Sequence, residues 1–370
     1  SLEILFSIWF FDVLFILEGG ILNRLGITAI SPYYGTGRYS WQTAGGFVSF
    51  ALWGLWISRN HLRQVWRKAI RPADPGIDDS REFLSYRGAM VGLLISCLYV
   101  GIWLGRAGME LKVILVILPA MLLVYTTISK MLADSGLIYL NPPTSAWGIT
   151  STLYGGTHYF QHSTKAALGL SSLGINHYRG LTMSLMMHIN RLAESVTGNK
   201  RKLFWGLCGA FAVGLVTSTL FTLWLGYSIG GYNFQPNWLI ISAGRGSLGG
   251  IATSIKKSTP TEATNYWFFL VGAGVMGLLN LMRYRFVWWP FHPIGFALSG
   301  TALARLTSVT ILVAWLLKLA MLKLAGAGFY RKSRPFFVGM LVGYILQVGI
   351  GLLVDAIWFQ PQGHTVHKWY

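Results

Sequence analysis

The chain has 370 residues and a formal net charge of +18, yet 53% of its residues are hydrophobic and only 11% are charged. Soluble domains carry about 25% charged residues, so this chain has too few to cover a surface that faces water. The composition therefore excludes a soluble enzyme, a disordered tail and a secreted disulfide scaffold. It predicts an all-α, polytopic transmembrane helical bundle, because helices satisfy their own backbone hydrogen bonds in lipid.

Apolar runs that approach 20 residues predict the membrane-spanning helices. In chain order these runs are Leu2–Leu22, Tyr39–Ser58, Gly88–Gly105, Val113–Ser129, Leu203–Ile229, Ala263–Met282, the shorter Leu306–Leu317, and Pro335–Val354. The sequence thus predicts a single transmembrane domain over residues 1–370, with seven or eight spans.

Two uncharged stretches do not resemble simple spans. Ser135–Thr164 contains two adjacent prolines and two adjacent glycines, and Phe286–Gly300 contains two prolines. Prolines remove backbone donors, and non-helical backbone at membrane depth persists only where protein buries it or water lines it. We expect broken or re-entrant helices here, the alternative being ordinary interfacial loops. The breaks are expected at Pro142 or Gly155 and at Pro290 or Pro293.

Basic residues predict the orientation of the chain in the membrane. Lys and Arg concentrate in Arg59–Arg87, Lys200–Lys202 and Lys323–Arg334, and such segments favour the cytoplasmic side. Residues 59–87 are expected to form a basic cytoplasmic loop, and the C-terminus, from His364 on, to lie outside the inner (plasma) membrane. The charge then serves topology and lipid headgroups, so membrane lipids are expected partners and nucleic acid is not.

Residues 181–198 differ from the spans. Leu181, Leu185, Ile189 and Leu192 recur on one side of a helix, and polar residues occupy the other. This pattern predicts an amphipathic helix that lies at the membrane interface.

Carboxylates inside apolar segments are candidate functional groups. Asp12 and Glu18 both lie in the first apolar run. An ionised carboxylate in lipid is costly and is usually kept for a partner, a cavity or a proton path. Both are therefore candidates for a substrate or proton path, and the alternative is an ion pair with an arginine such as Arg24 or Arg305.

Three histidines are further candidates. His158 and His162 have the i, i+4 spacing of two metal ligands on one helix, but no acidic residue or Cys accompanies them, so we favour a hydrogen-bonded pair in a polar cavity. His292 stands between two prolines and is a candidate gate, or else it caps a turn. No catalytic motif is present, so we expect neither an enzyme nor a bound cofactor or metal.

Several motifs resemble known families. Phe6–Glu18 resembles a span of oligopeptide-transporter-like proteins, while Trp289–Ser299, Tyr330–Gly339 and Gly363–Val366 are similar to a family of uncharacterised bacterial membrane proteins. Oligopeptide transporters have about twice as many spans, so the resemblance implies a C-terminal half, in keeping with the apolar start at Ser1. It also implies proton-coupled uptake of peptides or metal chelates at broken helices.

Two functions remain open. The first is an ion-coupled secondary transporter, and the second is a non-transporting subunit or scaffold that binds other membrane subunits. A transporter needs a polar cavity at mid-depth, reached by one of the candidate carboxylates or histidines, whereas a scaffold is packed there.

Overall fold

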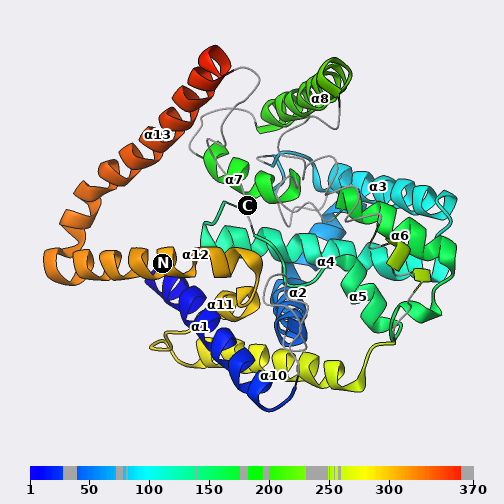
Figure 1. The fold of residues 1–370 in the computed structure, drawn as a ribbon, viewed down its shortest axis with the longest axis horizontal. Coiled ribbons are helices and arrows are strands. Elements are labelled where there is room, and N and C mark those ends of the chain that lie inside the picture. Colours follow the sequence, from blue (N-terminus) through cyan, green and yellow to red (C-terminus); the bar gives the residue numbers. More distant parts are fainter. Residues whose placement is uncertain are drawn as a thin grey trace.

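The computed structural model describes residues 1–27, 40–71, 78–80, 82–138, 140–175, 182–194, 200–230, 249, 251–253, 255–256 and 260–359. Within these ranges the chain is helical throughout (Figure 1), and an isolated bridge between Gly156 and Pro260 is the nearest approach to a strand. The expected all-α class is confirmed.

The helices follow one another with short connections. They are α1 (Leu2–Arg24), α2 (Ser40–Ile70), α3 (Tyr86–Arg106), α4 (Leu111–Ser135), α5 (Ala146–Leu153), the 3-10 turn η1 (Thr157–Tyr159), α6 (His162–Ile175), α7 (Thr182–Ala193), α8 (Lys200–Leu225), the π-helical η3 (Gly226–Gly230), α10 (Ala263–Arg285), α11 (Pro293–Leu298), α12 (Ala302–Ala320), the π-helical η6 (Met321–Ala325) and α13 (Gly326–Trp358).

Six helical stretches of the described chain are long and apolar enough to cross a membrane. They are Leu2–Arg24, Tyr86–Arg106, Leu111–Ser135, Lys200–Ser228, Ala263–Arg285 and Ala302–Trp358, the last of which contains both α12 and α13. Each of the eight apolar runs coincides with a helix, and the chain is an integral membrane protein. The number of spans stays a prediction, because α2 is not among the six.

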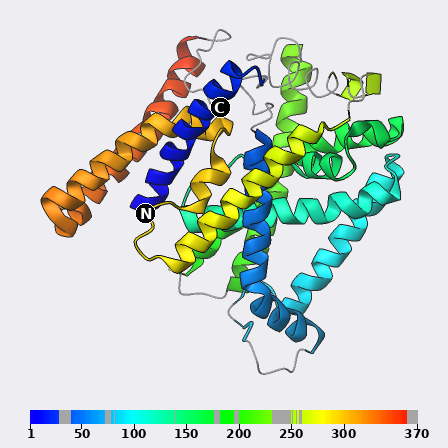
Figure 2. The ribbon, with the colours of Figure 1, turned by 90° about the horizontal axis from the view of Figure 1, so that it is seen from below.

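The exception of α2 has a structural reason. Its first turns are packed inside the protein, where Gln42 and Thr43 are buried, so this helix is less apolar than one that faces lipid. It crosses α10 with the two backbones in direct contact (Figure 2). A Cβ added at Gly45 would overlap the carbonyl of Phe269, and one added at Gly272 would overlap the carbonyl of Gln42. Glycine at both positions permits this close approach.

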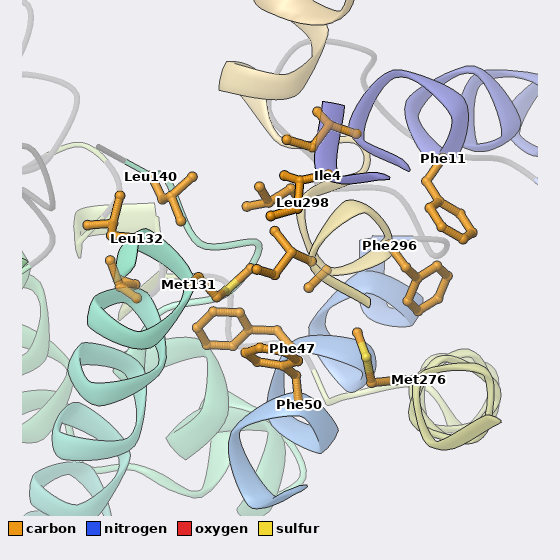
Figure 3. Close-up of a cluster of buried hydrophobic side chains, with 14 of the residues drawn as sticks. Ile4, Phe11, Phe47, Phe50, Met131, Leu132, Leu140, Met276, Phe296 and Leu298 are labelled. Atoms are coloured by element: carbon orange, nitrogen blue, oxygen red, sulfur yellow. The ribbon is translucent and has the colours of Figure 1, made fainter. Parts of the chain in front are cut away.

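The main hydrophobic core surrounds the short helix α11 (Figure 3). Side chains from four long helices and from α11 itself meet there, including Ile4, Phe11, Phe47, Phe50, Met131, Leu132, Met276, Phe296 and Leu298. A second cluster joins α3, α4 and α6 through residues such as Leu104, Val113 and Leu168. The fold therefore has its interior between α1, α2, α4 and α10.

Two long apolar helices lie apart from this interior. In Figure 1, α8 and α13 lie at the periphery, and none of the described residues of either helix is buried. Large apolar side chains such as Trp205, Phe221 and Leu352 are more than half exposed. Surfaces of this kind suit lipid or a protein partner within the membrane.

Two of the expected loops are largely helical. α2 continues to Ile70, so the first part of the expected basic loop at residues 59–87 is helix. The continuation contains neither glycine nor proline, whereas prolines occur soon after it. α13 likewise begins at Gly326 and includes Pro335, so Lys323–Arg334 lies in helical turns.

The other irregular features agree with the sequence. α7 (Thr182–Ala193) confirms a helix within residues 181–198, although residues 195–199 lie outside the described chain. Ser135–Thr164 is interrupted after α4 at Gly136 and again at Gly155, both with φ in the left-handed region. Phe286–Gly300 is not one helix either, because only Pro293–Leu298 is helical. Both predicted breaks are confirmed.

Candidate functional site

The six-residue helix α11 forms the centre of the candidate site. All of its residues are buried, and it packs on α1, where a Cβ at Gly295 would overlap the backbone of Ser7. Non-helical backbone flanks it on both sides, and at its C-terminal end Gly300 adopts a φ of +70°. A Cβ at Gly300 would also overlap the ring of Phe15, so this turn requires glycine.

Asp12 lies opposite that turn and is fully buried in α1. The backbone N–H of Gly300 donates a hydrogen bond of 3.2 Å to its Oδ1. On α12, the Ser308 hydroxyl and the Arg305 guanidinium also stabilise the carboxylate. The same guanidinium lies 5.6 Å from the ring centre of Phe15. Asp12 thus joins three segments of chain, with Arg305 as its nearest counter-charge.

His292 caps the start of α11. Its backbone N–H donates to Ser7 Oγ at 2.6 Å, and its Nδ1 accepts from the N–H of Ile294 at 3.2 Å. Because Nδ1 serves as an acceptor, it carries no proton in this arrangement. This geometry supports the capping alternative, and it gives no support to the expected gate at His292.

A third contact joins the beginning of α1 to the end of α10. Arg283 Nη1 lies 3.2 Å from Glu3 Oε2, and both side chains are partly exposed. Glu3, Ser7 and Asp12 therefore bind α10, the residue before α11, and the turn after it. The carboxylates and the hydroxyl on this side of α1 fix the broken segment in place.

Glu18 lies in a separate contact. It is half-buried, and its Oε2 accepts a hydrogen bond of 3.3 Å from Gln42 Nε2 on α2. This amide, rather than the expected Arg24, is the partner that the structure gives it. Six residues separate Glu18 from Asp12, so the two carboxylates face different neighbours.

His158 and His162 do not form the expected pair on one helix. His158 belongs to η1 and His162 begins α6, with an extended residue, Phe160, between the two elements. Both side chains are exposed, and they lie on the far side of α4 from Asp12 (Figure 1). Among the described residues, no group of three or more His, Cys, Asp or Glu side chains is arranged to bind a metal.

The sequence analysis overlooked Glu110, which links α4 to α6. Its Oε1 lies 3.0 Å from Lys112 Nζ, and its Oε2 accepts hydrogen bonds from Thr164 Oγ1 at 3.1 Å and from the N–H of Gln161 at 3.3 Å. The Thr164 hydroxyl in turn accepts from the N–H of Glu110. A carboxylate directly before an apolar run was the available signal, because acidic residues suit helix N-termini.

The hydrogen bond from Lys112, followed by those from Gln161 and Thr164, lowers the pKa of Glu110 below its ordinary value of 4.5. Its ionised form therefore stabilises the fold above about pH 4.5, and this stabilisation is lost as the pH falls through the lowered pKa. We expect Glu110→Ala to destabilise the protein by about 1–3 kcal/mol at neutral pH, as for lost hydrogen bonds to a charged group. Thermal unfolding at pH 7 and at low pH measures the difference.

Glu194→Ala is the matched control for Glu110→Ala. Glu194 pairs with Arg191 at 2.8 Å on the surface, where loss of an ion pair costs about 0–1 kcal/mol. If both variants unfold at the same temperature as the unmodified protein, the proposed role of Glu110 is wrong.

Comparison with curated proteins and with solved structures gives no match to this chain. A family model, by contrast, matches residues 1–367, which is nearly the whole length, and its description is that of a family of unknown function. The uncharacterised family expected from the sequence motifs is therefore supported at this level, and the chain belongs to the family of unknown function DUF6785.

Proposed function

We propose that the protein is an ion-coupled secondary transporter in which the Asp12 site is the coupling site. One observation carries the proposal: a fully buried carboxylate accepts a hydrogen bond from backbone at the break between α11 and α12. Transporters build ion sites at interrupted helices, and an ionisable group within a membrane bundle is costly unless it has a role. Peptides or metal chelates are the proposed substrates, from the resemblance of Phe6–Glu18 to oligopeptide transporters.

Access to the site requires movement. Asp12 and His292 are enclosed by packed side chains of the main core, so the described arrangement corresponds to a closed state. The contacts of Asp12 with Gly300 and Arg305 connect α1 to the turn between α11 and α12. Protonation of the carboxylate weakens the attraction to Arg305, and α12 then separates more easily from α1.

Asp12→Asn tests this mechanism. We expect the variant to take up peptides or metal chelates at least about tenfold more slowly under an imposed proton gradient, since removing a charge-assisted interaction costs about 1.5–3 kcal/mol. Uptake of a panel of labelled peptides and chelates into proteoliposomes is the measurement.

Asp134→Asn is the control for uptake. Asp134 forms an i, i+4 ion pair with Lys130 at 3.3 Å and is partly exposed, so its loss should change the rate less than about twofold. Equal rates for Asp12→Asn and the unmodified protein would remove the site assignment. An unmodified protein that takes up no member of the panel would end the transporter proposal.

The second candidate function is a non-transporting membrane subunit. It is favoured by the bare apolar surfaces of α8 and α13, which suit contact with other membrane proteins as well as with lipid. The enclosure of Asp12 is also what a scaffold requires. Failure of uptake together with co-purification of a stoichiometric membrane partner would favour this candidate.

The proposal includes location. We place the protein in the inner (plasma) membrane, with the basic segments in the cytoplasm and the C-terminus outside, since Lys and Arg favour the cytoplasmic side. Membrane lipids are its proposed partners, and no catalytic step is assigned to it.

A further inference from the structure

The C-terminal end of α2 projects beyond the packed part of the protein. α2 has 31 residues, which at 1.5 Å per residue gives about 46 Å, whereas the hydrocarbon core of a bilayer is about 30 Å thick. Its first turns cross α10, and its other end lies away from that crossing (Figure 2). The excess length places its last turns at the depth of lipid headgroups.

One face of this end carries arginines at helical spacing. Arg59, Arg63, Arg67 and Arg71 recur every four residues, and the N–H of Arg71 still donates to the carbonyl of Arg67 at 2.8 Å. All four side chains are exposed. Within the described chain, no carboxylate forms an ion pair with Arg63, Arg67 or Arg71. The row of charges therefore faces outward without a counter-charge.

The nearby acidic residues are engaged elsewhere. Asp78 accepts hydrogen bonds from the backbone N–H and the hydroxyl of Ser80, at 2.9 and 2.8 Å. Asp79 accepts from the N–H of Tyr86 at 3.1 Å. These contacts hold both carboxylates at the start of α3.

Large apolar side chains line the same face. Leu62, Trp66 and Ile70 are 46%, 55% and 62% exposed, and with the three arginines they form a groove of about 590 Å³. The opposite side of the helix, at Ala69, is buried. The groove lies within the range of about 300–1,000 Å³ that ligand sites occupy. A surface both basic and apolar requires a ligand with an anionic and an apolar part.

We propose that this face of α2 binds an anionic phospholipid. Arginine guanidinium groups bind phosphate oxygens through paired hydrogen bonds, and a fourth, Arg59, is held against the Trp56 ring at 4.6 Å. Trp66 occupies the boundary between headgroup and acyl chain, where tryptophan is enriched in membrane proteins. Leu62 and Ile70 contact the upper part of the acyl chains. The proposal is independent of transport.

Native mass spectrometry of the full chain, titrated with dioleoylphosphatidylglycerol or dioleoylphosphatidylcholine, tests the site. We expect retention of the anionic lipid to exceed that of the zwitterionic lipid by about tenfold or more, since each basic residue near the surface contributes to anionic-lipid affinity. The triple variant Arg63→Gln, Arg67→Gln, Arg71→Gln should lose this preference. Arg67→Glu alone should reduce it, and Trp66→Ala should weaken retention of the anionic lipid.

A matched variant removes the same charge elsewhere. Arg24, Arg106 and Arg285 are exposed arginines in the last turns of three other helices, and their replacement by Gln should leave the preference unchanged. Equal loss in this control, or an unchanged preference in the triple variant, would overturn the proposal. Binding of glycerol phosphate as tightly as the intact lipid would also overturn it, because the apolar half of the groove would then contribute nothing.

Discussion

Gly272→Ala is expected to destabilise the protein by about 3 kcal/mol, because the added methyl group overlaps backbone rather than a movable side chain. Its Cβ would overlap the carbonyl group of Gln42 at the crossing of α2 and α10. The two helices must then separate, which opens the main core around Met276 and Phe47. Thermal unfolding of the purified protein in detergent measures the change, at about 2–4 °C per kcal/mol.

Gly274 and Gly277 on the same helix provide the controls. A Cβ at either position would meet no described atom within 4 Å. Alanine there should be neutral, or should stabilise the helix by up to about 1 kcal/mol, since glycine is a poor helix former. A Gly272→Ala variant that unfolds at the same temperature as these controls would show that the close crossing of α2 and α10 is absent.

Asp12→Leu is expected to cost about 3 kcal/mol, the lower end for removing one partner of a buried ion pair, because Arg305 is only partly buried. The Arg305 guanidinium loses its nearest counter-charge, and the N–H of Gly300 loses its acceptor. The double variant Asp12→Leu, Arg305→Leu should recover a large part of this loss, since no charge is then left unpaired. Unfolding temperatures of the single and double variants give the coupling between the two residues.

Glu3→Leu is the control for Asp12→Leu. Glu3 is also a carboxylate on α1 that faces an arginine, Arg283, but this pair is exposed and should contribute only about 0–1 kcal/mol. If Asp12→Leu costs no more than Glu3→Leu, Asp12 is not a structural charge, and any loss of uptake in Asp12→Asn is then a direct effect on coupling.

The sequence predicted the long helices and both interruptions well. Apolar runs locate helices because lipid and core exclude charge, and prolines and glycines locate breaks because they change local backbone geometry. Both signals are local. The helical continuation of α2 through Ile70 was missed because charge was interpreted as loop, although Arg and Lys are good helix formers.

The contacts of the candidate site could not be predicted in the same way. Asp12 and Gly300 are separated by 288 positions in the sequence, and Ser7 and His292 by 285. Such pairs arise only when the helices pack, and no local pattern encodes them. The pairing of His158 with His162 was wrong for the reverse reason: regular helical spacing was assumed across a segment that turns at Gly156 and is extended at Phe160.

The apolar stretch Ala302–Trp358 constrains how the protein enters its membrane. Its 57 residues would reach about 85 Å as one straight helix, nearly three times the hydrocarbon thickness of a bilayer. The π-helical turn and Gly326, with a φ of +77°, divide it into two limbs. Two limbs joined by so short a connection insert together as a hairpin, so Ala302 and Trp358 reach the same face of the bilayer.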